Sequence, residues 1–191
     1  MSISEVNEKW ENLYRECLDC KKCELYKTKT NTVFGCGNRD ADVMFIGEAP
    51  GESEDLLGEP FVGASGKLLD KYFSAVGLPR ESVYIANILK CRPPKNRDPL
   101  PGEQDVCINY LRNQLLLVNP KIIVCLGRIS AKRLIKDDFK ITAEHGVFFK
   151  KGAYEICAIY HPSALLRDPS KREDMLKSMW EISKRVKMYQ K

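Results

Sequence analysis

The chain has 191 residues, of which 43% are hydrophobic and 30% charged, and a net charge of +5. These values are typical of a soluble globular protein, so we expect a single domain over residues 1–191 that buries its own core. No apolar run approaches the ~20 residues that span a bilayer, and the N-terminus carries Glu5, Glu8 and Glu11 in place of a basic and then apolar signal. We therefore expect a cytoplasmic protein without a membrane partner.

Apolar patterns along the chain predict alternating strands and helices. Four short apolar runs predict strands over residues 43–47, 83–89, 121–127 and 155–160. Helical spacing predicts helices over residues 4–17, 66–76, 103–118 and 129–135, and from residue 170 onward. Residues 148–154 are typical of a hairpin that leads into the last strand. This alternation favours an α/β fold in which helices cover both faces of a parallel sheet.

The first predicted strand ends in the loop Gly47-Glu48-Ala49-Pro50-Gly51. In open α/β sheets, ligands bind at the carboxyl ends of the strands. Glycine lets the backbone approach a ligand closely, and proline stiffens a turn. The loop is therefore a candidate floor of a binding site, although a plain strand-to-helix turn has the same composition.

Eight cysteines are many for a cytoplasmic chain, where clustered cysteines more often bind metal than form disulfides. Cys17, Cys20 and Cys23 are spaced three residues apart, but the fourth ligand of a ferredoxin-type run is replaced by Lys27. Cys20 and Cys23 could form a four-thiolate site with Cys91 and Cys107. The spacing leaves zinc, an iron-sulfur cluster and unrelated thiols open.

Two further segments carry candidate site residues. Residues 90–99 contain four basic side chains between prolines, a composition that suits contacts with phosphate. Residues 160–167 place His161 directly after the last predicted strand, at the same sheet edge as Gly47 and Asn87. Three polar elements are thus expected to converge on one cleft.

Several motifs in this order resemble a family-4 uracil-DNA glycosylase. They are Gly47-Glu48-Ala49-Pro50-Gly51 followed by Glu54-Asp55, Pro60-Phe61-Val62-Gly63, Asn87, Cys91-Arg92-Pro93-Pro94 with Asn96-Arg97, and His161-Pro162-Ser163 with Leu165-Leu166-Arg167. The resemblance covers residues 20 to about 167. It implies a three-layer α/β/α sandwich with a central four-stranded parallel sheet, a 4Fe-4S cluster on Cys20, Cys23, Cys91 and Cys107, and excision of uracil from DNA. Cys17 lies outside the family's ligand pattern.

The resemblance also implies roles for individual residues. The uracil pocket would use Gly47, Ala49, Glu54, Phe61 and Asn87, with Phe61 stacking on a flipped base and Asn87 pairing with its edge. His161 would donate a hydrogen bond to uracil O2 as the bond to the sugar breaks. Glu48 would position water or balance the charge of the sugar, because Ala49 cannot act as a base, and Glu54 and Asp55 are the alternatives. Thymine rejection is expected from Glu54.

DNA contacts are expected from Arg92, Arg97, Ser163, Leu165 and Arg167. Leu165 would fill the gap left by the flipped base, with ordinary core packing as its alternative role. The expected partner is uracil-containing DNA, single- or double-stranded. We expect a nucleoid-associated monomer, with a replication clamp as a further candidate partner.

Two other functions share parts of this sequence. A relative that binds uracil-DNA covalently would carry a basic insertion with a nucleophilic histidine, which is absent between Gly63 and Lys67. A non-catalytic iron-sulfur protein that binds nucleic acid would not need Glu48, Asn87 or His161. Excision assays on uracil-containing strands separate these alternatives.

Overall fold

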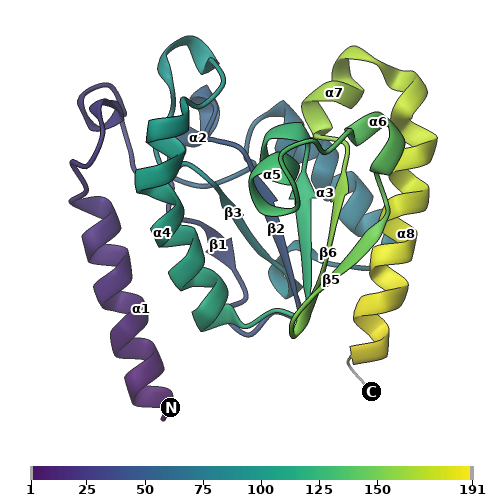
Figure 1. Ribbon diagram of the computed structural model, residues 1–191, viewed down its shortest axis with the longest axis horizontal. Helices are drawn as coiled ribbons and strands as arrows, with labels where there is room; N and C mark the ends of the chain where they lie inside the picture. The colour runs from purple at the N-terminus through teal and green to yellow at the C-terminus, as the bar shows by residue number, and fades with distance from the viewer. Residues whose placement is uncertain (1, 190–191) are drawn as a thin grey trace.

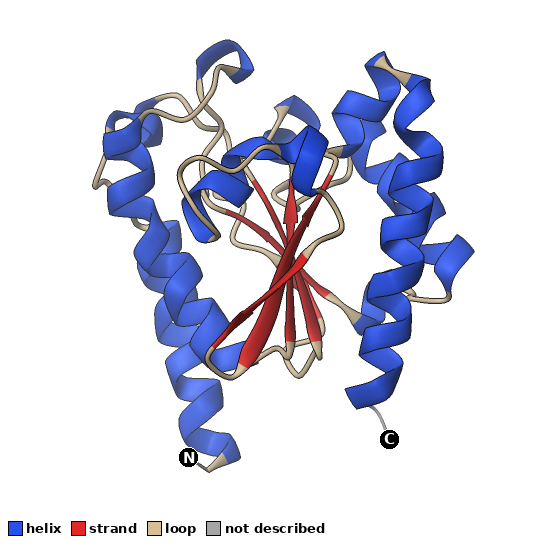
Figure 2. Cartoon of the chain, turned by 45° about the vertical axis from the view of Figure 1, so that its right-hand side comes forward, coloured by secondary structure: helices blue, strands red, loops and turns tan. Residues whose placement is uncertain are grey.

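The protein, described from residue 2 to residue 189 in a computed structural model, is built on a six-stranded sheet (Figures 1 and 2). The strands are β1 (Cys36–Gly37), β2 (Val43–Gly47), β3 (Tyr84–Asn87), β4 (Ile122–Leu126), β5 (Phe148–Lys151) and β6 (Tyr154–Ile159). Their spatial order is β1-β3-β2-β4-β6-β5, and the central four are parallel. The predicted four-stranded parallel sheet is confirmed, with two short antiparallel strands added at its edges.

The two edge strands have different sequence signals. The hairpin of β5 and β6 turns through two residues, with Gly152 at φ 60°, and was predicted. Strand β1 has two residues and is too short for a periodic pattern. It approaches β3 so closely that a Cβ atom on Gly37 would lie 2.0 Å from the Val83 carbonyl oxygen, and Gly37 has a φ of 114°. Only glycine fits this approach without strain.

Five helices correspond to the predicted helical segments, and each begins within two residues of its predicted first residue. They are α1 (Ile3–Leu18), α3 (Ala64–Val76), α4 (Pro101–Val118), α5 (Arg128–Leu134) and α8 (Arg172–Tyr189). Three shorter helices were not marked by periodicity: α2 (Glu52–Leu57), α6 (Ile141–Glu144) and α7 (Pro162–Arg167). Single turns of 3-10 helix are η1 (Glu24–Lys27), η2 (Arg80–Ser82), η3 (Pro94–Asn96) and η4 (Pro169–Lys171).

Helices cover both faces of the sheet and make a three-layer sandwich (Figure 1). Alternate residues of β2 face opposite layers: Met44 and Ile46 pack with α1, α4 and α5, whereas Val43 and Phe45 pack with α3 and α8. All five residues of β2 are buried, as expected for a parallel strand between two helix layers. None of the helices within residues 2–189 has the length and apolarity needed to cross a membrane.

Candidate functional site

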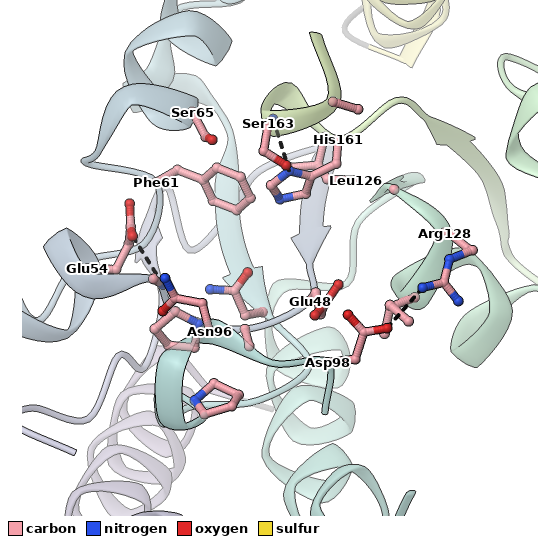
Figure 3. Close-up of a pocket in the computed structure, with 18 of the residues that line it drawn as sticks. Glu48, Glu54, Phe61, Ser65, Asn96, Asp98, Leu126, Arg128, His161 and Ser163 are labelled. Atoms are coloured by element: carbon pink, nitrogen blue, oxygen red, sulfur yellow. Dashed lines mark hydrogen bonds and ion pairs between the residues drawn. The ribbon is translucent and has the colours of Figure 1, made fainter. Parts of the chain in front are cut away.

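A cavity of about 470 Å³ opens at the carboxyl ends of the parallel strands (Figure 3). Each of these strands contributes to it: Glu48 follows β2, Asn87 ends β3, Gly127 follows β4 and His161 lies beyond β6. The expected convergence of three polar elements on one cleft is confirmed. The topology explains it, because parallel strands present their carboxyl ends at one edge.

Asn87 lies almost entirely inside the protein yet lines this cavity. Its side chain is 2% exposed, and its Oδ1 is buried without a hydrogen-bond partner among residues 2–189. Gly47 makes room for it, since a Cβ atom at position 47 would lie 2.3 Å from Asn87 Oδ1 and 2.7 Å from Phe61 Cζ. Gly47 therefore forms the floor beneath both side chains and does not line the cavity itself.

Phe61 forms one wall of the cavity, and its ring lies beside His161. The two ring centroids are 5.6 Å apart, and the planes are tilted by 38°. Phe61 has a φ of 54°, a left-handed conformation that costs an aromatic residue about 1–3 kcal/mol unless its surroundings hold it. Such strain is concentrated at functional sites.

Glu54 holds the loops on either side of this wall. Its carboxylate accepts hydrogen bonds from the backbone N–H groups of Val62 at 2.9 Å, Gly63 at 2.8 Å and Gly51 at 3.1 Å. The residue lines the cavity, but its oxygens are engaged by the backbone. Asp55, the other alternative base, is buried and accepts from the N–H groups of Thr30 and Asn31. The structure thus gives Asp55 a role in holding the Thr30 segment, away from the cavity.

His161 is neutral over most of the pH range. Burial, reinforced by the charge of Arg167, lowers its pKa to about 4. Its Nδ1 accepts a hydrogen bond from the backbone N–H of Ser163 at 3.1 Å and lies 2.8 Å from the Ser163 hydroxyl oxygen. Because a backbone N–H can only donate, Nδ1 carries no proton in the neutral ring and the proton is on Nε2. His161 thus offers a hydrogen-bond donor without a positive charge.

Glu48 lies next to Asp98, which is paired with Arg128 (Figure 3). Arg128 Nη2 lies 3.0 Å from Asp98 Oδ2. Burial raises the pKa of Glu48 to about 7, repulsion from Asp98 adds to the rise, and attraction to Arg128 opposes it. The carboxyl group therefore changes charge close to neutral pH, which suits a group that handles water or a proton.

The expected DNA-contacting side chains lie in different surroundings. Ser163, Arg167 and Arg97 line the cavity, and Arg97 is also paired with Glu103 through two bonds of 2.6 and 2.9 Å. Arg92 lies outside the cavity lining and donates to Asn96 Oδ1 at 2.7 Å. Arg92 Nη1 also lies 3.4 Å from Glu52 Oε1, so of these three arginines Arg167 is the one without an ion pair in the described part of the chain.

Leu165 does not face outward as the wedge role requires. Its side chain is 0% exposed and packs in the core formed with α3 and α8. The neighbouring Leu166 is 46% exposed on the same helix. The prediction for Leu165 is therefore wrong in this structure, because α7 turns residue 165 inward and residue 166 outward.

A second cavity lies between α1, η1 and α4. Five cysteine side chains line it: Cys17, Cys20, Cys23, Cys91 and Cys107. Thiolates that bind one zinc ion each lie ~2.3 Å from it. Among residues 2–189, no three His, Cys, Asp or Glu side chains are grouped closely enough to hold a metal ion. Burial raises the pKa of Cys91 to about 12 and of Cys107 to about 11, so their thiolates require a compensating positive charge. The structure thus brings the four predicted cysteines and Cys17 to one cavity, but shows no metal-ligand group among residues 2–189.

The structure adds cavity residues that the sequence reading did not single out. Asp98, Gly127 and Arg128 all line the cavity. Gly127 has a φ of 93°, and a Cβ atom there would lie 2.8 Å from the His161 Cβ. A signal was present for Gly127, since it ends the predicted strand over residues 121–127 just as Gly47 ends the first predicted strand. Asp98 lies in the predicted segment 90–99, but that segment was marked for its basic side chains, which gave no signal for an acidic one.

Comparison with known proteins assigns the chain to a family. A family model described as the uracil DNA glycosylase superfamily matches residues 34–184. The chain is 49% identical over 177 residues to a type-4 uracil-DNA glycosylase of Archaeoglobus fulgidus, covering 87% of this chain and 88% of the relative. It is 41% identical over 191 residues to the type-4 enzyme of Sulfurisphaera tokodaii (94% and 87% covered) and 44% identical over 167 residues to that of Saccharolobus solfataricus (83% and 77% covered). The chain therefore belongs to the uracil-DNA glycosylase superfamily and, within it, to the type-4 family.

Proposed function

We propose that this protein removes uracil from DNA by hydrolysing the N-glycosidic bond, which leaves an abasic site. The observation that carries the proposal is the Oδ1 of Asn87, which is buried at the wall of the cavity and has no hydrogen-bond partner among residues 2–189. A buried polar atom without a partner costs free energy, so its retention at this position favours a ligand that supplies the missing hydrogen.

Uracil supplies that hydrogen and also fits the rest of the amide. Asn87 Oδ1 accepts from uracil N3–H while its amide nitrogen donates to O4. Cytosine presents an amino donor and an unprotonated N3 at the same positions, so both contacts fail. A site built on such hydrogen bonds discriminates by ~10⁴ or more, because the wrong base leaves buried groups unpaired. Phe61 stacks on the face of the flipped base.

His161 stabilises the leaving group. When the glycosidic bond breaks, the electron pair stays on uracil and negative charge grows on O2, to which His161 Nε2–H donates. The low pKa of His161 keeps the ring neutral, so it acts as a hydrogen-bond donor. Ser163 fixes its orientation through the N–H contact to Nδ1.

Glu48 completes the reaction on the sugar side. The departing base leaves a cationic sugar, which water attacks, and the Glu48 carboxylate orients that water and balances the positive charge. Ala49 supplies no carboxylate in this loop, and the Glu54 oxygens are engaged by backbone N–H groups. Glu48 therefore suits this role better than Glu54.

On the DNA, we assign the wedge to Leu166, which is exposed where Leu165 is buried. Ser163, Arg167, Arg97 and Arg92 are the proposed phosphate contacts.

The test is incubation with a DNA strand that contains one uracil, followed by alkaline cleavage, beside matched strands with cytosine, thymine or hypoxanthine. We expect cleavage at uracil alone, and its loss in Asn87→Ala and His161→Ala. Arg185→Gln, remote from the cavity, is the matched control and should retain full activity. An intact uracil strand that is nevertheless bound in a gel shift would identify a recognition module and reject the excision role.

We further propose that Cys20, Cys23, Cys91 and Cys107 hold a 4Fe-4S cluster. When bound, the cluster supplies a cross-link between the N-terminal segment, the loop after β3 and α4, and the chemistry at uracil proceeds in the other cavity. The backbone N–H of Lys90 donates to Cys107 Sγ at 3.3 Å, a contact typical of cluster thiolates. Cys17 lines the same cavity but lies outside the family's ligand pattern.

Metal analysis tests this assignment. We expect iron and acid-labile sulfide, with broad visible absorbance that bleaches on reduction. Cys91→Ser should lose the absorbance, whereas Cys36→Ser, at a half-buried thiol outside the cavity, should keep it. A colourless protein with stoichiometric zinc would refute an iron-sulfur site.

A further inference from the structure

Phe61, the residue proposed to stack on the base, has a backbone conformation that is sterically unfavourable for a residue with a bulky side chain. Its φ of 54° lies in the left-handed region, and its ring is placed between the floor at Gly47 and the ring of His161. On the far side, α3 passes so close that a Cβ atom at Gly66 would lie 1.8 Å from the Phe61 carbonyl oxygen. The surroundings must therefore hold the peptide groups on both sides of Phe61.

On the C-terminal side, Glu54 supplies that restraint through the N–H groups of Val62 and Gly63. On the N-terminal side, the restraint comes from an arginine outside the cavity. Arg80 Nη2 donates to the carbonyl oxygen of Pro60 at 2.5 Å, one residue before Phe61. The strained residue is thus held between an anion and a cation from different elements.

Arg80 is itself fixed. Its Nη1 donates to Asp70 Oδ1 at 2.8 Å, so α3 anchors one arm of the guanidinium while the other arm reaches Pro60. The two bonds come from different nitrogens of the planar guanidinium, whereas lysine would have to make both from one nitrogen atom. Arg80 does not line the cavity and cannot touch a bound base.

We infer that Arg80 is a positioning residue: by holding the Pro60 carbonyl it keeps Phe61 in its left-handed conformation and presents the ring to the flipped base. The inference rests on the proposed function in that Phe61 is taken to stack on uracil. The arrangement of the ring itself is independent of activity and can be measured directly.

The first readout is the NMR spectrum of the imidazole groups. The chain has two histidines, His145 and His161, and only His161 is paired with the Phe61 ring. In Arg80→Gln, we expect the His161 signals to shift as the Phe61 ring moves, while the His145 signals stay in place. Arg185→Gln is the matched control, because its side chain is 32% exposed against 27% for Arg80 and is also paired with a carboxylate, at 2.6 Å. The control should leave the His161 signals in place.

The second readout is a double-mutant cycle in kcat/KM on uracil-DNA. Arg80→Gln should lower kcat/KM by about tenfold in the wild-type background, since a misplacement of ~1 Å can cost up to ~10²-fold. In a Phe61→Leu background, Arg80→Gln should lower kcat/KM by less than about twofold, because the aromatic ring that Arg80 positions is absent. Arg80→Lys should recover little, whereas a purely electrostatic role would be rescued by it.

The outcomes separate the two proposals. Unmoved His161 signals, or an equal loss with and without Phe61, would overturn the positioning role. Absence of uracil excision in the wild type would reject the proposed function but leave the NMR result valid. If Arg80→Gln does not fold by circular dichroism, Asp70→Asn loosens the same arginine and should produce the same shift of His161; its failure to do so overturns the inference.

Discussion

Glu48 is a cavity side chain whose charge changes near neutral pH. Since burial raises its pKa to about 7, the carboxylate is present above that pH and is lost as the pH falls through it. We expect the single-turnover excision rate to rise with pH up to a plateau above about 7. Glu48→Gln should be slower and lack this rising limb. A limb that persists in Glu48→Gln would assign it to another group.

The raised pKa of Glu48 also predicts a pH effect on stability. The folded protein holds this proton more tightly than the unfolded chain, whose carboxyl group has the ordinary value of 4.5. Stability contributed by the protonated carboxyl is therefore present below pH 4.5 and is lost as the pH rises through about 7. Glu48→Gln should narrow the difference between unfolding midpoints at pH 5 and pH 8, and an unchanged difference would contradict the shift.

His161 predicts a different pH response. Its pKa of about 4 means that the ring stays neutral across the range in which free histidine titrates near 6.5. His161→Ala should lower the single-turnover rate by ~10²–10³ with little change in DNA affinity, because it removes one donor to the departing base. NMR titration of the imidazole checks the charge state directly. A midpoint near 6.5 would show that the ring is cationic at acidic working pH.

At the scale of a single element, α7 distinguishes two adjacent leucines. Leu165→Ala should lower the free energy of unfolding by ~2–5 kcal/mol, since it opens a void in the core. Leu166→Ala should leave stability nearly unchanged but slow excision from duplex DNA more than from a single strand, where no gap needs filling. Thermal unfolding and paired excision assays measure both. The reverse pattern would return the wedge role to Leu165.

At the scale of the whole molecule, affinity for DNA should depend on salt. The net charge of +5 is mild, so the slope of log K against log salt reports the arginines near the cavity more than a broad basic surface. Arg167→Gln should reduce the magnitude of the slope by about 1, as one phosphate contact is lost. Arg185→Gln, on α8 and paired with Glu155 outside the cavity, should leave the slope unchanged. An unaltered slope in Arg167→Gln would reject the phosphate contact.

The sequence by itself determined the α/β class, the four parallel strands and the side chains that meet at their carboxyl ends. It could do so because buried parallel strands are continuous apolar runs, and because the residue after each run must lie at the same edge. The motif around His161 was visible for a related reason, because its position directly after the last apolar run places it at that same edge.

Only the tertiary structure decided which leucine of α7 is buried, that Asp55 turns away from the cavity, and that Asp98 and Arg128 face Glu48. These side-chain orientations depend on how a helix is rotated and on how a loop folds back. The residues of a short segment do not encode either of them. The same holds for Arg80, which reaches Pro60 from 20 positions away along the chain. Its bond exists because α3 and β3 bring the two segments together, and no local pattern records a contact made by packing alone.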